Sequence, residues 1–203
     1  MGCAEVPLVV NAAKAAKMLI VGDSDPAFNR EQIAKIPYAT ISAKIGRGPK
    51  SLLVLGKMER RNLYWISADN AVLVTSNGRI VQSAGFPENL IKTRFHGSDP
   101  VDRRLHLNDL PRWSVREIDT NAEKRYGIPI FSEYERLGER NISIAGVNIE
   151  TILVKENNST KTVNWRFSNY YWADKYDGFI WKSRQHIART FPPIEIEVLK
   201  PSA

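Results

Sequence analysis

The chain has 203 residues, of which 43% are hydrophobic and 25% are charged. These values are those of an ordinary globular protein, so the composition excludes collagen, coiled coils and intrinsic disorder, and the length fits one compact domain. The one cysteine, Cys3, excludes an intramolecular disulfide and a cysteine-based zinc site. The formal net charge of +7 attracts polyanions such as acidic polysaccharide, anionic lipid or nucleic acid.

Residues 1–35 form the part of the chain with helical character. Residues 12–21 are rich in alanine, and the stretch Asp23-Ser24-Asp25-Pro26 is typical of a helix start, with a capping side chain and a proline in the first turn. This second helix is expected to run through Phe28 and Ile33 and to end before Pro37. An Asp-x-Asp pair also occurs in metal sites, but no acidic cluster accompanies this one, so we interpret it as a helix cap.

From Pro37 onward, apolar and polar residues alternate with the period of half-buried β-strands. Strands are predicted at residues 38–45, 51–55, 63–66, 71–75, 79–82, 147–154, 162–172, 179–187 and 194–199. Short turns join them at residues 59–62, 76–78, 157–159, 176–178 and 192–193. Because short turns join only antiparallel strands, we predict a mainly β fold over residues 36–203: a single antiparallel, strongly curved sheet or a partly open barrel or sandwich. Residues 89–140 contain three prolines and a weaker pattern, and they are expected to hold loops or a short helix.

Catalytic signatures are missing from the sequence. The three histidines lack metal-ligand spacing, and the glycine-rich stretch 46–50 contains a proline and leads into a strand, unlike a phosphate-binding loop. Paired acids, Glu133 with Glu135 and Glu195 with Glu197, share strand faces, where alternating surface charge explains them more simply than glycoside hydrolysis does. We therefore expect a protein that is not an enzyme and that holds no metal or cofactor.

The candidate binding residues lie in a hairpin near the C-terminus. Residues 161–189 carry six Lys or Arg against two Asp, and residues 165–181 contain eight of the nineteen aromatic residues. Alternation places Trp165, Phe167 and Tyr171 on one face, which is expected to be core. The opposite face carries the candidates Arg166, Tyr170, Trp172, Lys182 and Arg184. Aromatic rings beside cations suit a sugar-bearing or anionic partner; the alternatives are that the rings are core or that surface ion pairs neutralise the cations.

The N-terminus begins Met1-Gly2-Cys3. A small residue followed by cysteine is how a bacterial lipobox ends, so Cys3 is the predicted lipid attachment site, and export by a signal peptide is expected. The alternative, N-myristoylation at Gly2, requires Ser or Thr at position six, where this chain has Val6.

Several stretches resemble the YjbF/GfcB lipoproteins, the group 4 capsule and exopolysaccharide-associated family of Gram-negative bacteria. The matching pieces are Ile36-Pro37-Tyr38-Ala39-Thr40, residues 65–79, Gly97-Ser98-Asp99-Pro100, Trp113-Ser114, Tyr171-Trp172, Lys182-Ser183-Arg184-Gln185 and Leu199-Lys200-Pro201. The resemblance implies a lipoprotein that carries palmitate on Cys3, is anchored in the outer membrane and faces the periplasm. It implies no catalytic residue. Ala4 follows the cysteine where an inner-membrane retention signal would have Asp, which favours the outer membrane.

Three functions follow from these observations. The preferred one is a non-enzymatic accessory in exopolysaccharide or capsule secretion or assembly. Its expected partners are the membrane that holds its lipid anchor, an acidic polysaccharide and outer-membrane export proteins, but not nucleic acid. The second is a lipid- or lipoprotein-handling β carrier, which needs a large apolar concavity. The third is a polysaccharide-trimming enzyme, which needs close carboxylates in a cleft.

Overall fold

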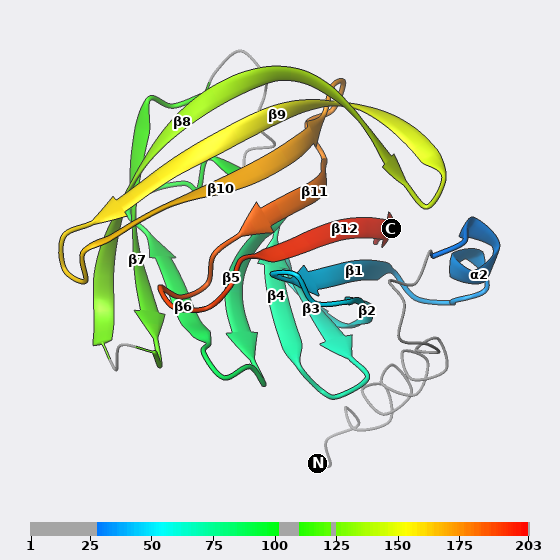
Figure 1. The fold of residues 1–203 in the computed structure, drawn as a ribbon, viewed down its shortest axis with the longest axis horizontal. Helices are drawn as coiled ribbons and strands as arrows, with labels where there is room; N and C mark the ends of the chain where they lie inside the picture. The colour runs from blue at the N-terminus through cyan, green and yellow to red at the C-terminus, as the bar shows by residue number, and fades with distance from the viewer. Residues whose placement is uncertain (1–27, 102–109, 123–124, 203) are drawn as a thin grey trace.

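The protein folds as one large antiparallel β-sheet, and the computed structural model describes residues 28–101, 110–122 and 125–202. The elements are α2 (Arg30–Ala34), β1 (Thr40–Ile45), β2 (Lys50–Glu59), β3 (Asn62–Ser67), β4 (Val72–Ser76), β5 (Arg79–Ala84), β6 (Leu90–Phe95), β7 (Trp113–Thr120), β8 (Arg125–Ile144), β9 (Val147–Thr160), β10 (Trp165–Asp174), β11 (Ile180–Gln185) and β12 (Ile194–Lys200). The twelve strands are hydrogen-bonded in the order β5-β4-β3-β2-β1-β12-β11-β10-β9-β8-β7-β6, and the sheet curves until β5 and β6 lie side by side (Figure 1). The predicted mainly β fold is confirmed, and its form is a nearly closed barrel.

In the part of the chain that the structure describes, no helix has the length and apolar character needed to cross a membrane.

Helix α2 is short and lies on the outside of the barrel, near the start of β1 (Figure 1). Asn29 caps it, because its Oδ1 accepts a hydrogen bond from the backbone N–H of Glu31 at 2.8 Å. The helix ends before Pro37, as predicted. The prediction that it passes through Phe28 is wrong, because Phe28 and the extended Asn29 precede the first turn. The predicted helix start at residues 23–26 and the lipid attachment site Cys3 lie outside the described residues.

Strand β2 is buried on both faces at its middle. Leu53 faces the barrel interior, while Leu52 and Val54 pack outside it against Ile36 and Phe28. A strand that is covered on both sides has a continuous apolar run instead of an alternating one. The segment from Phe28 to Ile36 therefore acts as an outer cover for this part of the sheet.

Two tight hairpin turns lie where the sequence predicted them. Arg60 and Arg61 join β2 to β3, and Asn77 and Gly78 join β4 to β5. Asn77 and Gly78 have φ angles of 43° and 87°, as in the hairpin turns whose twist matches that of the flanking strands. A Cβ atom at Gly78 would lie 2.5 Å from Cβ of Ile180 in β11. The β4–β5 turn therefore packs directly against β11 across the barrel.

The expectation for residues 89–140 is wrong for most of this region, because it holds β6, β7 and most of the 20-residue strand β8, while residues 96–100 and 110–112 lie outside strands as expected. Pro129 lies in β8 opposite Glu117 of β7, before the first residue of β8 that pairs with β9, Phe131. At that position β8 has a ladder partner on one side, which is where a strand tolerates a residue without an N–H.

The predicted turn at residues 157–159 is also wrong, because these residues continue β9. Asn158 is buried, and its side chain accepts a hydrogen bond from Ser132 Oγ at 2.7 Å and donates one to Glu156 Oε2 at 3.3 Å. Asparagine and serine favour turns because they bond to their own backbone. Asn158 does donate to the nearby backbone oxygen of Glu156 at 3.0 Å, but pairing with β8 and β10 and the hydrogen bond from Ser132 keep the segment extended.

The barrel interior is filled mainly by apolar side chains from alternate strand positions. The central cluster includes Ile41, Leu53, Trp65, Leu73, Ile80, Ile118, Ile130, Trp165, Ile194 and Ile196. Trp165 and Phe167 of β10 stack with their ring centroids 3.8 Å apart, and Tyr171 is fully buried on the same face. The predicted inner face of the aromatic hairpin is therefore part of the core.

Polar side chains close the seam between β5 and β6. These strands are the two ends of the sheet order, so no ladder of described residues joins them. Instead, the backbone N–H of Leu90 donates to Ser83 Oγ at 2.9 Å. Arg79 of β5 reaches Asp99, which follows β6, with Nε 2.6 Å from Oδ2. Closure of the barrel thus depends on specific side chains at this seam.

Candidate functional site

Four of the five candidate residues meet on the outside of β10 and β11. Tyr170 is paired with Arg184, and Trp172 with Lys182. The rings of Tyr170 and Trp172 are 6.5 Å apart, and Lys182 Nζ lies 5.5 Å from the Trp172 ring centroid, within cation–π range. Arg166 lies on the same face of β10, nearer its start. The predicted alternation of faces is therefore confirmed, while a binding role for these residues stays a prediction.

Lys182 is a neutralised cation. Its Nζ lies 2.8 Å from Glu195 Oε1 and 2.9 Å from Glu197 Oε1, both on β12. Burial lowers the pKa of Lys182, but hydrogen bonds to the two carboxylates outweigh this effect and raise the pKa above its ordinary value. Burial alone would raise the pKa of Glu197. The hydrogen bonds from Lys50 and Lys182 outweigh this effect, so the pKa of Glu197 lies below its ordinary value. The alternative in which surface ion pairs neutralise the cations of this hairpin therefore applies to Lys182, whose partner acids lie on β12.

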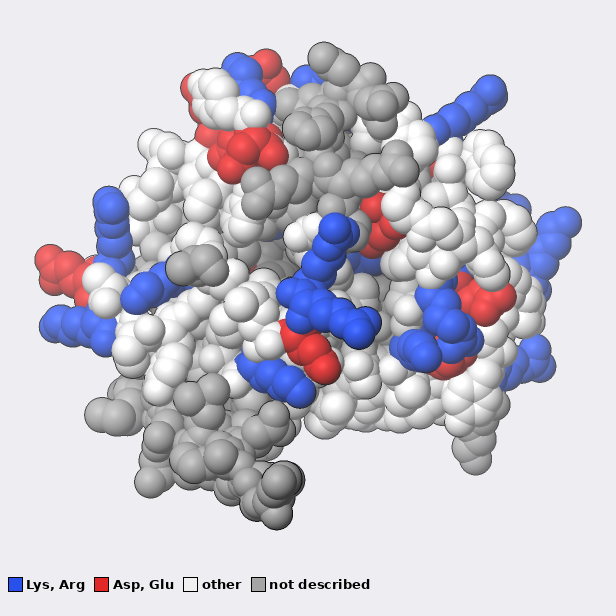
Figure 2. Space-filling model, turned by 180° about the vertical axis from the view of Figure 1, so that it is seen from behind, with Lys and Arg blue, Asp and Glu red and all other residues white. Residues whose placement is uncertain are grey.

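The remaining cations of this face are dispersed. Arg166 and Arg184 are exposed, and neither has an ion-pair partner among the described residues. Figure 2 shows a similar arrangement on the back of the molecule, where Lys and Arg side chains are spread out and several have Asp or Glu beside them. The net positive charge is therefore not gathered into one large patch on that side.

A groove of about 640 Å³ lies over β7, β8, β9 and β10. The strand register arranges its outward side chains in two rows that cross these strands. One row consists of Phe131, Ser159 and Arg166; the other consists of Trp113, Glu133, Asn157 and Ser168. Of the five candidate residues, Arg166 lines this groove; the other four belong to the neighbouring outer face of β10 and β11.

Two exposed aromatic side chains in the groove were missed by the sequence analysis. Trp113 is 67% exposed and Phe131 is 55% exposed. Large apolar side chains that cluster in a surface concavity mark interaction sites more often than scattered ones do. Both lie in residues 89–140, where the prolines hid the strands. The available signal was local: apolar and polar residues alternate with a period of two from Trp113 to Arg116, whereas no such alternation marks Phe131.

The groove combines three kinds of contact group. Trp113 and Phe131 offer ring faces, Arg166 offers a guanidinium group, and Asn157 with Ser168 offers polar side chains joined by a hydrogen bond of 3.0 Å from Ser168 Oγ to Asn157 Oδ1. Flat rings, planar cations and short polar groups together can contact both faces and hydroxyl groups of a sugar ring. The arrangement is suited to noncovalent binding of a carbohydrate, with a preference for an anionic one.

The carboxylates of the groove do not form the pair used in glycoside hydrolysis. Among the described residues that line it, Glu133 is the one acidic residue. Glu135, next on that face of β8, is paired across the strands with Lys155. Hydrolysis of a glycosidic bond ordinarily uses two carboxyl groups that flank it. The described lining therefore supplies binding groups and one carboxylate.

Beneath the groove, the buried carboxylate of Glu156 ties its strands together. Arg79 donates to both oxygens, with Nη2···Oε1 at 2.7 Å and Nη1···Oε2 at 3.1 Å, and Arg116 Nη1 lies 2.9 Å from Oε1. Further hydrogen bonds come from Tyr134, Asn158, Asn169 and Tyr171. Burial raises the pKa of Glu156, but the charges of Arg116 and Arg79 outweigh it and hold the pKa well below its usual range. The ionised carboxylate thus joins β5, β7, β8, β9 and β10.

This network reaches the floor of the groove. Arg116 Nη1 also donates to Ser132 Oγ at 2.7 Å, and Ser132 and Asn158 both line the groove. Because these residues are fixed from inside, the rows of side chains outside them are held in a defined arrangement, which lowers the entropic cost of binding. Sequence reasoning missed the network, since Arg79 and Glu156 are 77 residues apart.

Comparison with known proteins identifies the family. The model described as "Group 4 capsule polysaccharide lipoprotein gfcB, YjbF" matches residues 13–199. The chain belongs to this family. The chain is 30% identical over 173 residues to the lipoprotein GfcB of Escherichia coli (strain K12), which covers 85% of this chain and 80% of GfcB. It is 25% identical over 170 residues to the lipoprotein YjbF of the same organism, which covers 84% of this chain and 79% of YjbF.

A solved structure in the comparison agrees with this assignment. The crystal structure of the hypothetical lipoprotein YmcC from Escherichia coli (K12) matches with a TM-score of 0.83 and 25% identity over the full length of both chains. The resemblance drawn from the sequence is therefore confirmed. Three of the resembling segments meet inside the barrel, because Arg79 contacts Asp99 and Gln185 Nε2 donates a hydrogen bond to the backbone oxygen of Gly78 at 2.7 Å.

Proposed function

We propose that this family member is a non-enzymatic accessory of capsule or exopolysaccharide secretion that binds the polymer in the groove over β7–β10. The observation that carries the proposal is the exposure of Trp113 and Phe131 in one concavity with Arg166. An aromatic side chain loses little conformational entropy on binding, and its ring covers the apolar face of a sugar. The guanidinium of Arg166 pairs with the carboxylate or phosphate groups of an acidic polymer.

The shape of the surface favours a chain over a small sugar. Next to the groove, the outer face of β10 continues from Ser168 to Tyr170, and Tyr170 is paired with Arg184 of β11. From Arg166 to Tyr170 the strand advances by about 13 Å, at ~3.3 Å per residue. A polymer that extends beyond the groove thus has a further aromatic residue and a further exposed arginine within reach. Trp172 is less accessible to it, because Lys182 covers its ring.

The proposal places the protein in the outer membrane, facing the periplasm, with palmitate among the acyl groups on Cys3. It is supported by the lipoprotein relatives and by the Gly2-Cys3-Ala4 sequence. A cysteine with several acyl chains provides stable anchoring, whereas one chain provides only marginal membrane binding. Anchoring would hold the groove near the site of polymer export, where outer-membrane export proteins are further proposed partners.

The test is the affinity of the purified protein for acidic capsule polysaccharide, measured by isothermal titration calorimetry. Trp113→Ala and Phe131→Ala are each expected to weaken binding by about tenfold, the cost typical of a central aromatic contact. Arg166→Gln is expected to weaken binding at low salt more than at high salt, because the contact is electrostatic.

The matched control is Tyr176→Ala. Tyr176 is 81% exposed and lies in the β10–β11 turn, beyond the opposite end of β10 from Arg166. Its removal is expected to leave the affinity unchanged. Unchanged affinity in both Trp113→Ala and Phe131→Ala would refute the groove as the binding site. Retained polymer affinity combined with lost secretion in cells would assign the groove to an export protein instead.

A further inference from the structure

A second concavity lies at one end of the barrel, apart from the groove. It has a volume of about 610 Å³ and is lined mainly by residues of β1, β2, β3, β4, β11 and β12, and of the β2–β3, β4–β5 and β10–β11 turns. The groove and this end cavity share no described lining residue. Its volume lies within the range of about 300–1,000 Å³ that is usual for small-molecule sites. The end cavity is thus a separate place where a ligand of ordinary size fits.

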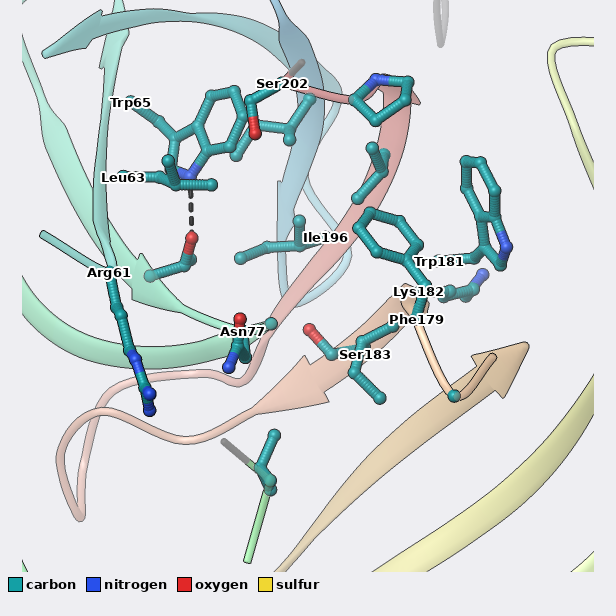
Figure 3. Close-up of a pocket in the computed structure, with 18 of the residues that line it drawn as sticks. Arg61, Leu63, Trp65, Asn77, Phe179, Trp181, Lys182, Ser183, Ile196 and Ser202 are labelled. Atoms are coloured by element: carbon teal, nitrogen blue, oxygen red, sulfur yellow. Dashed lines mark hydrogen bonds between the residues drawn. The ribbon is translucent and has the colours of Figure 1, made fainter. Parts of the chain in front are cut away.

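The walls of the end cavity are somewhat more apolar than polar. Figure 3 shows the side chains that form them, among which are Leu63, Trp65, Phe179 and Ile196. Polar groups of the lining already have partners: Trp65 Nε1 donates to Thr75 Oγ1 at 2.8 Å, and Ser183 Oγ accepts from Gln185 Nε2 at 2.9 Å. A polar ligand group between these walls would lose its hydrogen bonds to water, whereas a hydrocarbon chain would lose none. The walls therefore suit an apolar chain.

The charged groups of the lining have one sign. Arg60 and Arg61 are exposed and form the β2–β3 turn at the rim, and the third cation, Lys182, is paired with Glu195 and Glu197. No carboxylate occurs among the described residues that line the cavity. Arg60 has a φ angle of 55°, a left-handed conformation for which glycine or asparagine is the usual residue in a tight hairpin turn. The turn thus keeps a positive charge at the rim in spite of its backbone geometry.

We propose that the end cavity binds an anionic amphiphile: a single apolar chain between the walls, with a phosphate or carboxylate headgroup at Arg60 and Arg61. This inference goes beyond polymer binding, because it concerns a different site and a different class of ligand. An exposed arginine pair at the mouth of an apolar cavity selects the sign of the headgroup, while the walls select for hydrocarbon. Fatty acids, lysophospholipids and polyprenyl phosphates share this chemistry.

The test uses three probes with the same twelve-carbon chain, each below its micelle concentration, in calorimetric titrations with the purified protein. The probes are dodecyl phosphate, dodecyl maltoside and dodecyltrimethylammonium. Dodecyl phosphate is expected to bind one to one and most tightly, and dodecyltrimethylammonium most weakly. The double variant Arg60→Glu/Arg61→Glu is expected to bind dodecyl phosphate about tenfold more weakly, because two favourable charges become repulsive. Val198→Trp, which fills the cavity, is expected to remove binding of all three probes.

Two controls separate this site from the rest of the molecule. Arg47→Glu/Lys161→Glu reverses the same number of exposed charges in the β1–β2 and β9–β10 turns, away from the rim, and is expected to leave binding unchanged. Trp113→Ala is likewise expected to bind dodecyl phosphate normally, so that failure of the groove and failure of the end cavity are distinguishable. Equal affinity for the anionic and cationic probes, or an unchanged affinity in Arg60→Glu/Arg61→Glu, would overturn the proposal. Competition with dodecyl phosphate by palmitate, lysophosphatidylglycerol and farnesyl phosphate then distinguishes fatty acids, lysophospholipids and polyprenyl phosphates as ligands.

Discussion

Replacing Glu156 by glutamine tests whether the buried network holds the barrel together. The substitution keeps the shape of the side chain but removes the negative charge that balances Arg79 and Arg116. Arg79 retains Asp99 at 2.6 Å, whereas Arg116 has no ion-pair partner besides Glu156, at 2.9 Å, among the residues that the structure describes. Removing one partner of a buried ion pair costs about 3–5 kcal/mol, because the other charge stays buried without compensation. For a domain of this size, ~1 kcal/mol corresponds to about 2–4 °C, so the melting temperature is expected to fall by about 6–20 °C.

The assay is thermal unfolding followed by circular dichroism, with Glu139→Gln as the matched control. Glu139 makes an ion pair with Lys175 at 3.0 Å, but its side chain is 63% exposed. Exposed pairs contribute about 0–1 kcal/mol, so this variant is expected to unfold within about 4 °C of the wild type. A loss of stability in Glu156→Gln that is no larger than in Glu139→Gln would refute the stabilising role of the Glu156 network.

Glu156 also makes the stability of the folded protein depend on pH, and the direction of this dependence follows from its lowered pKa. The pKa of Glu156 in the folded protein lies below its value in the unfolded chain, which is about 4.3. Its stabilising contribution is therefore complete above that unfolded value and is lost as the pH falls toward the folded pKa. The wild type is expected to lose stability below about pH 5 more steeply than Glu156→Gln does. Equal slopes for the two proteins in urea unfolding between pH 3 and 6 would contradict this assignment.

Three further predictions concern other parts of the chain. Gly78→Ala is expected to destabilise the protein by about 1–3 kcal/mol in urea unfolding, and more than Gly146→Ala, because both glycines have positive φ angles but only the first has a neighbour that a Cβ would meet. Arg184→Glu is expected to reduce salt-sensitive polysaccharide binding with little change in melting temperature, whereas Lys182→Glu is expected to lower stability, since it adds a third carboxylate beside Glu195 and Glu197. Cys3→Ser is expected to abolish metabolic labelling with a palmitate analogue, and equal labelling of this variant and the wild type would show that the anchor lies elsewhere.

The fold class was predictable because local signals agreed with each other. Alternation gave the strand faces of β10 and β11, and Asn77-Gly78 gave a hairpin turn with the expected positive φ angles. The prediction of a turn at residues 157–159 failed because Asn158 also accepts a hydrogen bond from Ser132 of β8, which is 26 positions away in sequence. Such a long-range contact is invisible to a local propensity.

The candidate site was only partly predictable. Arg166 was found, because its hairpin carries a visible excess of charge and aromatic residues. Trp113 and Phe131 were missed, since their strands lie among prolines, and their proximity to Arg166 depends on the register of four strands. The neutralisation of Lys182 by Glu195 and Glu197 likewise depends on the pairing of β11 with β12.

The most direct test of polymer binding in the groove is a titration of the isotope-labelled protein with acidic capsule oligosaccharide, followed by nuclear magnetic resonance. If the polymer binds in the groove, saturable chemical-shift changes are expected at the indole N–H of Trp113 and at the backbone amides of Asn157, Ser159 and Ser168, which line it. No chemical-shift change is expected at the indole N–H of Trp65, which lies in the end cavity. Saturable chemical-shift changes elsewhere on the barrel, with none at the groove residues, would contradict polymer binding in the groove.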